Sequence, residues 1–432
     1  MNSPIILKEH QPFVNPKGYG NKLDYSSKME YLVGLGLKFE EPGFLEEPKY
    51  LGIYNWTASY YIGAAWLVPD ELAVVVTPKI PNIDFVQMFV AALEVDTQEE
   101  SNYFAKCYGI QFDEPQIETN EELNQLTPLL VLHFISLLER LVKRGLKKDY
   151  ILHEENLKSK VKGRLLLSKH LKTNIFQQRN DRLYCQYQEY TDDIPENRLL
   201  KKTLLFSERI LERCESLQKQ KSYLKTQSRL NHLKMAFNHI SDDIEPYQVQ
   251  KLSSNKLFKG YKEALKVAKM ILRRFDYSIR EASSEQHTTP PFWIDMARLY
   301  EMWVLSRLQD NIINPIFFQE SGSYKRQVAD FVIKEENLIL DAKYKPQYVE
   351  DWVDIDDIRE LSGYARDNRL LPNLPEDYSP RCIILYPGDS DELKPESDIL
   401  FEQQGQKIPY YRNFYKISVP LPKLPFPSRT PN

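Results

Sequence analysis

A predicted hairpin in the last third of the chain constrains the fold more than any other feature. Residues 327–333 (QVADFVI) and 338–343 (LILDAK) are apolar and rich in β-branched side chains, and a charged turn, KEEN, separates them. Runs of this kind predict two antiparallel strands. Helical patterns on both sides and two later apolar runs give the order helix, two strands, helix, strand, strand. That order is typical of an α/β domain built around a mixed sheet.

The register of this hairpin decides which side chains meet. If Ile333 pairs with Leu338, Asp330 lies directly opposite Asp341, whereas a slip of one residue would separate the two acids. Because side chains alternate along a strand, Lys343 shares a face with Asp341. The pattern therefore predicts two carboxylates and a lysine on one side of the sheet.

Two close carboxylates repel each other, and a divalent cation relieves that repulsion. Carboxylate oxygens suit Mg²⁺, for which Mn²⁺ can substitute, and such an ion activates water and polarises a phosphoryl oxygen. A neighbouring lysine can orient the water or neutralise developing charge. This is the chemistry of metal-assisted phosphodiester hydrolysis. The alternative is a charged hairpin on the solvent face of a sheet, and the spacing alone leaves both open.

Composition and absent motifs exclude several classes of protein. The chain has 432 residues, 42% of them hydrophobic and 27% charged, which allows two or three globular domains. No apolar run is long enough for a membrane span, so no membrane association is expected. The four scattered cysteines disfavour a disulfide framework or zinc site and fit the cytoplasm. No P-loop motif occurs, so we expect this chain to bind no nucleotide itself.

The pattern of elements predicts a multidomain α+β protein in three parts. Residues 1–125 read as a β-rich N-terminal module, 126–280 as a mainly helical connecting region, and 281–432 as the α/β domain that contains the hairpin. The polar and proline-containing stretch at 281–291 is the best boundary in the chain. A helix is expected from about residue 292 to 308, directly before the hairpin.

The connecting region carries two basic clusters. A helix is expected to begin at Thr127 and end at Gly145, and we interpret the lysines and arginine around its end as a solvated helix terminus. Farther along, every second residue is basic, which predicts one basic face of a strand. The members of this run are Lys158, Lys160, Lys162 and Arg164. Contact with nucleic acid, contact with an acidic partner surface and simple solvation remain open for it.

Several motifs in this order resemble those of one family. The most specific are DIPENRLLK at 193–201 and LDAKYK at 340–345, with KRGLKKDY at 143–150 and the tripeptide KGR at 162–164 between the N-terminal and C-terminal parts. Near the N-terminus, YIG at 61–63 and TPKI at 77–80 also match. Together they resemble McrC, the nuclease subunit of McrBC-type restriction systems that depend on modified cytosine. McrC belongs to the PD-(D/E)xK nuclease superfamily.

This resemblance implies roles for individual residues. Asp330 and Asp341 would be metal-binding carboxylates and Lys343 the catalytic lysine. Further side chains that would line the site are Glu301, Glu360 and Tyr364. The chain departs from the family at Ala329, where proline is usual, and at Glu360, where related enzymes often carry glutamine.

The resemblance also implies partners. A separate McrB-like AAA+ GTPase would assemble into a ring and translocate double-stranded DNA. This chain would dock on the ring through its N-terminal module, stimulate GTP hydrolysis and cut the DNA as a defence against phage and other foreign DNA. Two alternatives remain: an adaptor that activates the ring without cutting, and a stand-alone repair nuclease of the same fold.

Overall fold

The computed structural model describes most of the chain in segments. These are residues 4–12, 48–95, 103–111, 114–119, 126–213, 221–249, 259–280, 287–324, 327–349, 352–372, 374–375, 378–388 and 405–424. The chain divides into two compact units. The first unit comprises residues 1–126, 216–222 and 285–432, and the second comprises 127–215 and 223–284. The expected N-terminal module and the expected hairpin domain thus belong to the same unit.

The N-terminal part of the first unit is a five-stranded sheet of order β1-β3-β2-β10-β4. Its strands are β1 (Ile5–Lys8), β2 (Tyr61–Val68), β3 (Leu72–Thr77), β10 (Phe292–Asp295) and β4 (Tyr108–Ile110). β1 pairs with β3 in parallel, and the other neighbours are antiparallel. Helix α2 (Phe85–Val95) follows β3, and a separate pair joins β5 (Ile117–Thr119) to β9 (His287–Thr289).

Strand β10 corrects the expected helix over residues 292–308. The first four residues of that span form a strand, and helix α9 (Met296–Asn311) begins only after Asp295, whose side chain caps it by accepting a hydrogen bond from the Arg298 amide. β10 inserts between β2 and β4, strands distant in sequence. The approach to β2 is so close that a Cβ at Gly63, φ +140°, would lie 2.1 Å from the Phe292 carbonyl oxygen. Only glycine fits there, which explains the YIG motif.

The hairpin domain holds a six-stranded mixed sheet of order β11-β12-β13-β14-β16-β15. Its strands are β11 (Phe317–Ser321), β12 (Val328–Ile333), β13 (Leu338–Ala342), β14 (Arg381–Gly388), β15 (Gln406–Lys407) and β16 (Phe414–Pro420). β13, β14 and β16 run parallel to one another, while β11 and β12 are antiparallel to their neighbours. The expected mixed sheet is confirmed.

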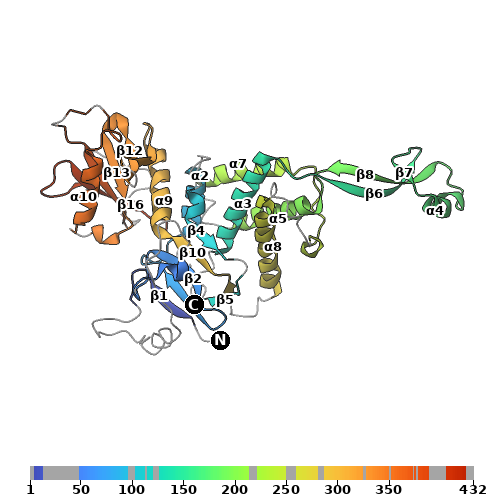
Figure 1. Ribbon diagram of the computed structural model, residues 1–432, viewed down its shortest axis with the longest axis horizontal. Helices are drawn as coiled ribbons and strands as arrows, with labels where there is room; N and C mark the ends of the chain where they lie inside the picture. Colours follow the sequence, from blue (N-terminus) through green and yellow to red (C-terminus); the bar gives the residue numbers. More distant parts are fainter. Residues whose placement is uncertain are drawn as a thin grey trace, which may run out of the picture. The chain divides into compact units, whose positions relative to one another are not determined.

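Two helices support this sheet. Helix α10 (Ile355–Tyr364) packs on one face, where Ile358 and Leu361 join Ile339 and Ile384 of the central strands in one buried cluster. Helix α9 leads from β10 of the N-terminal sheet to β11 and contacts both α2 and β13 (Figure 1). The first unit therefore links its two sheets through one continuous strand and helix.

The C-terminal segment returns to the N-terminal part of the first unit. The Asp84 amide donates to the Pro422 carbonyl over 2.8 Å, and the Leu424 amide donates to the Asn82 carbonyl over 2.9 Å. The Trp303 indole of α9 donates to the Pro420 carbonyl over 2.9 Å. These bonds tie the end of β16 to the elements around α2.

The second unit combines helices with an extended ribbon. Its helices are α3 (Leu126–Arg144), α5 (Pro195–Arg213), α7 (Lys221–Ala236) and α8 (Lys259–Arg280). β6 (Asp149–Lys158) and β8 (Arg182–Thr191) pair over ten residues into a ribbon that extends away from α5 (Figure 1). Short strand β7 (Arg164–Leu165), helix α4 (Leu167–His170) and a π-helical turn (Leu171–Ile175) complete its far end. No described helix in either unit is both long and apolar enough to traverse a lipid bilayer.

The DIPEN motif joins the base of the ribbon to the helices. The Asn197 side chain donates to the carbonyls of Lys147 and Asp192 over 2.9 and 2.7 Å, and it accepts from the Tyr261 hydroxyl over 2.9 Å. Lys147 is buried, and its ammonium lies 2.8 Å from Glu196. The interpretation of this lysine as part of a solvated helix terminus is therefore wrong. Gly145, φ +90°, ends α3 as expected.

Candidate active site

The hairpin has the register that the sequence predicts. Ile333 pairs with Leu338 and Phe331 pairs with Leu340, so the same ladder places Asp330 opposite Asp341. β13 is fully buried because β12 and β14 flank it. The Asp341 side chain is only 3% exposed, which makes its charge expensive unless a cation lies nearby.

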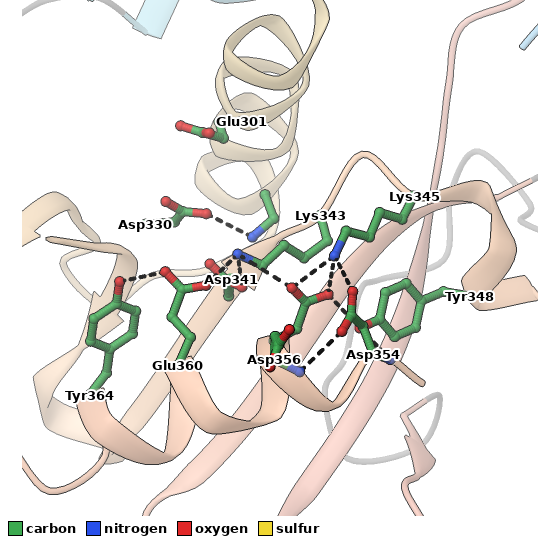
Figure 2. A network of polar contacts seen from close by, with 12 residues as sticks. Glu301, Asp330, Asp341, Lys343, Lys345, Tyr348, Asp354, Asp356, Glu360 and Tyr364 are labelled. Atoms are coloured by element: carbon green, nitrogen blue, oxygen red, sulfur yellow. Dashed lines mark hydrogen bonds and ion pairs between the residues drawn. The ribbon is translucent and has the colours of Figure 1, made fainter. Parts of the chain in front are cut away.

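Lys343 provides such a cation. Its ammonium lies 2.8 Å from Asp341 Oδ2 and 2.8 Å from Glu360 Oε2 (Figure 2). The Tyr364 hydroxyl donates to Glu360 Oε1 over 2.8 Å. Glu360 and Tyr364 are one helical turn apart on α10, and that helix lies against the face where Lys343 projects. The predicted site-lining pair thus meets the lysine.

Asp330 is held by two donors. The Ala342 amide donates to Asp330 Oδ2 over 2.9 Å, and the Gln319 side-chain amide donates to Oδ1 over 3.1 Å. The same Gln319 nitrogen lies 3.0 Å from Glu301 Oε2, which also accepts from the Tyr103 hydroxyl. Glu301 projects from α9 on the side of Asp330 away from Glu360 (Figure 2). Three acids therefore surround the end of β13.

The buried environment disfavours simultaneous ionisation of these acids. Burial raises the pKa of Asp330 to about 7, and Glu301 adds to the effect. Burial likewise raises the pKa of Glu301 to about 7, and burial beside Asp330 holds the pKa of Asp341 well above its usual range. Burial opposes charge on Lys343, but the neighbouring Asp341 and Glu360 carboxylates outweigh it and raise its pKa. Lys343 is therefore a fixed cation at neutral pH.

The second lysine of the LDAKYK motif has a different position. The Lys345 ammonium lies 2.7 Å from Asp354 and 2.9 Å from Asp357, near the start of α10. The Tyr348 hydroxyl also donates to Asp357, over 2.6 Å. Asp354 caps α10 by accepting a hydrogen bond from the Asp356 amide. Lys345 thus anchors the helix that carries Glu360, while Lys343 faces the acids.

The donor set fits a hard divalent cation. Mg²⁺ usually takes one or two protein carboxylates and completes its shell with water and phosphate oxygens. Asp330 and Asp341 supply two carboxylates from opposed positions. Asp341 Oδ2 is buried and accepts no hydrogen bond of favourable geometry, although Lys343 is near. Among the described residues, no group of three or more His, Cys, Asp or Glu is arranged to hold a metal.

Sequence reasoning missed two parts of this site. Gln319 and Tyr103 contact the acids directly, yet neither belongs to a motif. Gln319 has a left-handed backbone, φ +53°, inside β11. Tyr103 comes from the N-terminal part of the unit, and no local pattern signals its contact with Glu301.

The Lys79 side chain ties the N-terminal sheet to the segment after β13. The Lys79 ammonium donates to the Tyr344 carbonyl over 2.6 Å, and its backbone amide donates to Glu9 over 2.8 Å. Burial raises the pKa of Glu9 to about 7, although Lys79 counteracts this. Lys79 belongs to the TPKI motif, but the motif alone does not predict that Lys79 contacts Tyr344.

The basic run lies in the second unit and differs from its prediction. Only Lys158 and Arg164 belong to strands, and the residues between them form an exposed loop. The predicted strand face over these four residues is therefore wrong. Lys162 lies over the Tyr187 ring at 3.8 Å and 3.8 Å from Glu189, and Lys158 lies 4.0 Å from Asp181. Lys160 is exposed in the same loop.

Comparison with known protein families now identifies the chain. A model of the family described as the McrBC 5-methylcytosine restriction system component matches residues 57–362, well over half of the chain. This chain belongs to that family. The resemblance to McrC drawn from the motifs is thereby confirmed. The family match includes the DIPEN motif, the hairpin and Glu360. No curated protein matches the chain significantly.

Two solved structures of McrBC proteins are similar to this family member. One is a half-complex from a tetradecameric assembly of Thermococcus gammatolerans McrB AAA+ hexamers with bound McrC; its matching chain is 17% identical, with coverage of 97% of this chain and 94% of that chain and a TM-score of 0.39. The other is a Thermococcus gammatolerans McrBC complex, whose matching chain is 16% identical. That match covers 72% of this chain and 89% of that chain, with a TM-score of 0.30.

Proposed function

We propose that this chain is the Mg²⁺-dependent DNA endonuclease subunit of a GTP-driven McrBC-type restriction system. The observation that carries the proposal is the pairing of Asp330 opposite Asp341 with the Lys343 ammonium beside them. Acid, acid and lysine on adjacent strands are the elements of a PD-(D/E)xK site. Family membership supports the restriction context.

The site residues would divide the work as follows. Asp330 and Asp341 would hold Mg²⁺ or Mn²⁺, which supplies an activated water and polarises the scissile phosphate. The neighbouring Asp341 and Glu360 carboxylates raise the pKa of Lys343 and favour its ammonium form, so the proposal does not assign it the role of base. Lys343 instead neutralises charge that develops on the phosphate and orients the attacking water. Glu360 binds Lys343 from the exposed side and fixes the direction of its side chain.

The proposal gives Glu301 a supporting role. Burial raises its pKa to about 7, so it is partly protonated near neutral pH. It faces Asp330 from α9. On that side of the site it can accept a proton, or a hydrogen bond from a water that a bound metal would hold. Its hydrogen bonds to Gln319 and Tyr103 fix it in this orientation.

We further propose an McrB-like AAA+ GTPase ring as the partner and double-stranded DNA as the substrate. The sequence has no P-loop, and one similar solved chain comes from an assembly of McrB AAA+ hexamers with bound McrC. The N-terminal module, residues 1–125, is one candidate for the docking surface. The far end of the ribbon is a second, because apolar side chains that are 44–81% exposed gather there: Val161, Leu167, Leu171, Ile175 and Phe176.

The basic residues of the ribbon fit either partner or nucleic acid. Lys158, Lys160, Lys162 and Arg164 are exposed next to this apolar surface. Two of them already lie near acids, which lowers the net positive charge that DNA would meet.

The test measures DNA cleavage and GTP hydrolysis in one reaction, with and without the GTPase partner, for wild-type protein and Asp341→Ala. We expect cleavage only with both proteins, and loss of cleavage with GTPase stimulation unchanged in the variant. Cleavage by wild-type chain alone would instead indicate a stand-alone nuclease. GTPase stimulation without cleavage by the wild type would indicate an adaptor and refute the nuclease assignment.

A further inference from the structure

Gln319 has an unusual backbone at a position next to the acids. In the β11–β12 ladder, Phe318 pairs with Phe331 and Glu320 pairs with Ala329, so this register places Gln319 opposite Asp330. Its φ of +53° is left-handed, a conformation that residues with a side chain adopt only at an energetic cost. Strained backbone of this kind is often found at functional sites. The strain calls for a compensating contact.

The contact is a bridge between two acids. The Gln319 side-chain nitrogen lies 3.0 Å from Glu301 Oε2 and 3.1 Å from Asp330 Oδ1. A carboxamide nitrogen carries two protons, so it can donate one to each carboxylate. This neutral bridge reduces the repulsion between the acids and fixes the orientation of Asp330, whose other oxygen accepts from Ala342.

Neighbouring aromatic rings pack around this part of β11. Phe318 stacks against Phe331 with centroids 5.5 Å apart, and the Tyr103 ring meets Phe318 edge-on at 5.0 Å. The Tyr103 hydroxyl also donates to the Glu301 oxygen that Gln319 contacts. Glu301 is thus fixed from two sides.

We propose that Gln319 is a positioning residue of the nuclease site, which orients Asp330 for the divalent cation by bridging it to Glu301. This inference rests on the proposed function and adds a residue that no sequence motif contains. In this proposal the side-chain amide of Gln319 and its backbone have separate roles. The left-handed backbone directs the side chain toward the acids, and the amide positions Asp330.

Gln319→Gly tests this division because glycine adopts a positive φ without strain, so the backbone can keep its conformation while the side chain and its amide are removed. Mn²⁺ affinity of the full-length chain, without nucleotide or DNA, is measured by isothermal titration calorimetry, and the melting temperature is measured in EDTA. We expect Mn²⁺ to bind about 10-fold more weakly, a typical loss when a residue that orients a metal ligand is removed. The melting temperature should stay unchanged or rise.

Asn337→Gly is the matched control. Asn337 has a φ of +52° in the turn of the same hairpin, and its substitution should leave Mn²⁺ affinity unchanged. Asp341→Ala removes a proposed metal ligand and should abolish Mn²⁺ binding.

If Gln319→Gly binds Mn²⁺ as tightly as wild type while Asp341→Ala does not bind, the inference is wrong and the proposed function stands. If the wild type binds no Mn²⁺, both fail. A weaker Mn²⁺ affinity in Gln319→Gly accompanied by a lower melting temperature would also overturn the inference, because a general loss of structure would then explain both.

Discussion

Replacing Asp330 with asparagine should stabilise the metal-free protein at alkaline pH, even though the change removes a residue of the proposed metal site. Asp330 is half-buried opposite Asp341 and close to Glu301. Burial raises its pKa to about 7 from an ordinary value of 3.8, so ionising it costs folding free energy. Asparagine has nearly the same shape and no charge.

The magnitude follows from the linkage between proton binding and folding. Because the folded state holds the proton more tightly, stability falls as pH rises from about 4 through 7 and levels off above it. A difference of about three pKa units corresponds to about 4 kcal/mol at pH 8, which is an upper value for a site that water can reach. Asparagine can serve only one of the two donors that Asp330 satisfies, which costs about 1 kcal/mol. The net gain should be about 2 kcal/mol, or about 4 °C in melting temperature.

The assay is thermal unfolding in EDTA at pH 5 and pH 8, with Asp356→Asn as control because Asp356 is 82% exposed on α10. We expect the gain for Asp330→Asn at pH 8 to be almost absent at pH 5, where wild-type Asp330 is protonated. Added Mg²⁺ should raise the melting temperature of the wild type and leave the variant unchanged. A variant less stable than wild type at both pH values, yet equally responsive to Mg²⁺, would refute the reasoning.

Three further predictions concern other contacts. Lys343→Met should lower the DNA cleavage rate at least about 100-fold while GTPase stimulation in the same reaction is retained; loss of both would point to a structural role instead. Lys79→Met should destabilise the chain by about 3 kcal/mol at pH 8 and by less at pH 5. The reason is that Glu9 loses its neighbouring cation and must then be protonated to remain buried. Equal losses of stability in urea unfolding at both pH values would contradict this. Asn197→Ala should cost about 2–4 kcal/mol, because it removes the donor to the Lys147 carbonyl and the acceptor of the Tyr261 hydroxyl proton. Thermal unfolding should show the loss with Mn²⁺ affinity unchanged, and a shift in that affinity would argue against a purely local effect.

The parts of the fold that sequence could predict are those set by neighbours along the chain. The hairpin register follows from a four-residue turn and two apolar strands, and it places Asp330 opposite Asp341 as expected. The apolar stripe of α3 follows from helical spacing. Its residues Leu130, Phe134, Leu137, Leu138 and Leu141 are all buried. In both cases local geometry decides the outcome.

The rest depends on pairings between distant segments. Residues 292–295 resemble the start of a helix, but β2 and β4 recruit them into a sheet. Lys147 follows a helix end and looks solvated, yet Glu196, about fifty residues later, buries it. Tyr103 and Gln319 reach the acids through contacts that no spacing rule encodes. Alternation of charge at 158–164 was misleading because the chain turns there, with Gly163 at φ +68°.

The central claim is that Asp330 and Asp341 share a divalent cation, and anomalous diffraction from crystals soaked in MnCl₂ tests it most directly. The account predicts one peak about 2.1 Å from a carboxylate oxygen of each residue, absent from Asp341→Ala crystals prepared in the same way. A peak elsewhere in wild-type crystals, or the same peak retained in Asp341→Ala, would contradict the account.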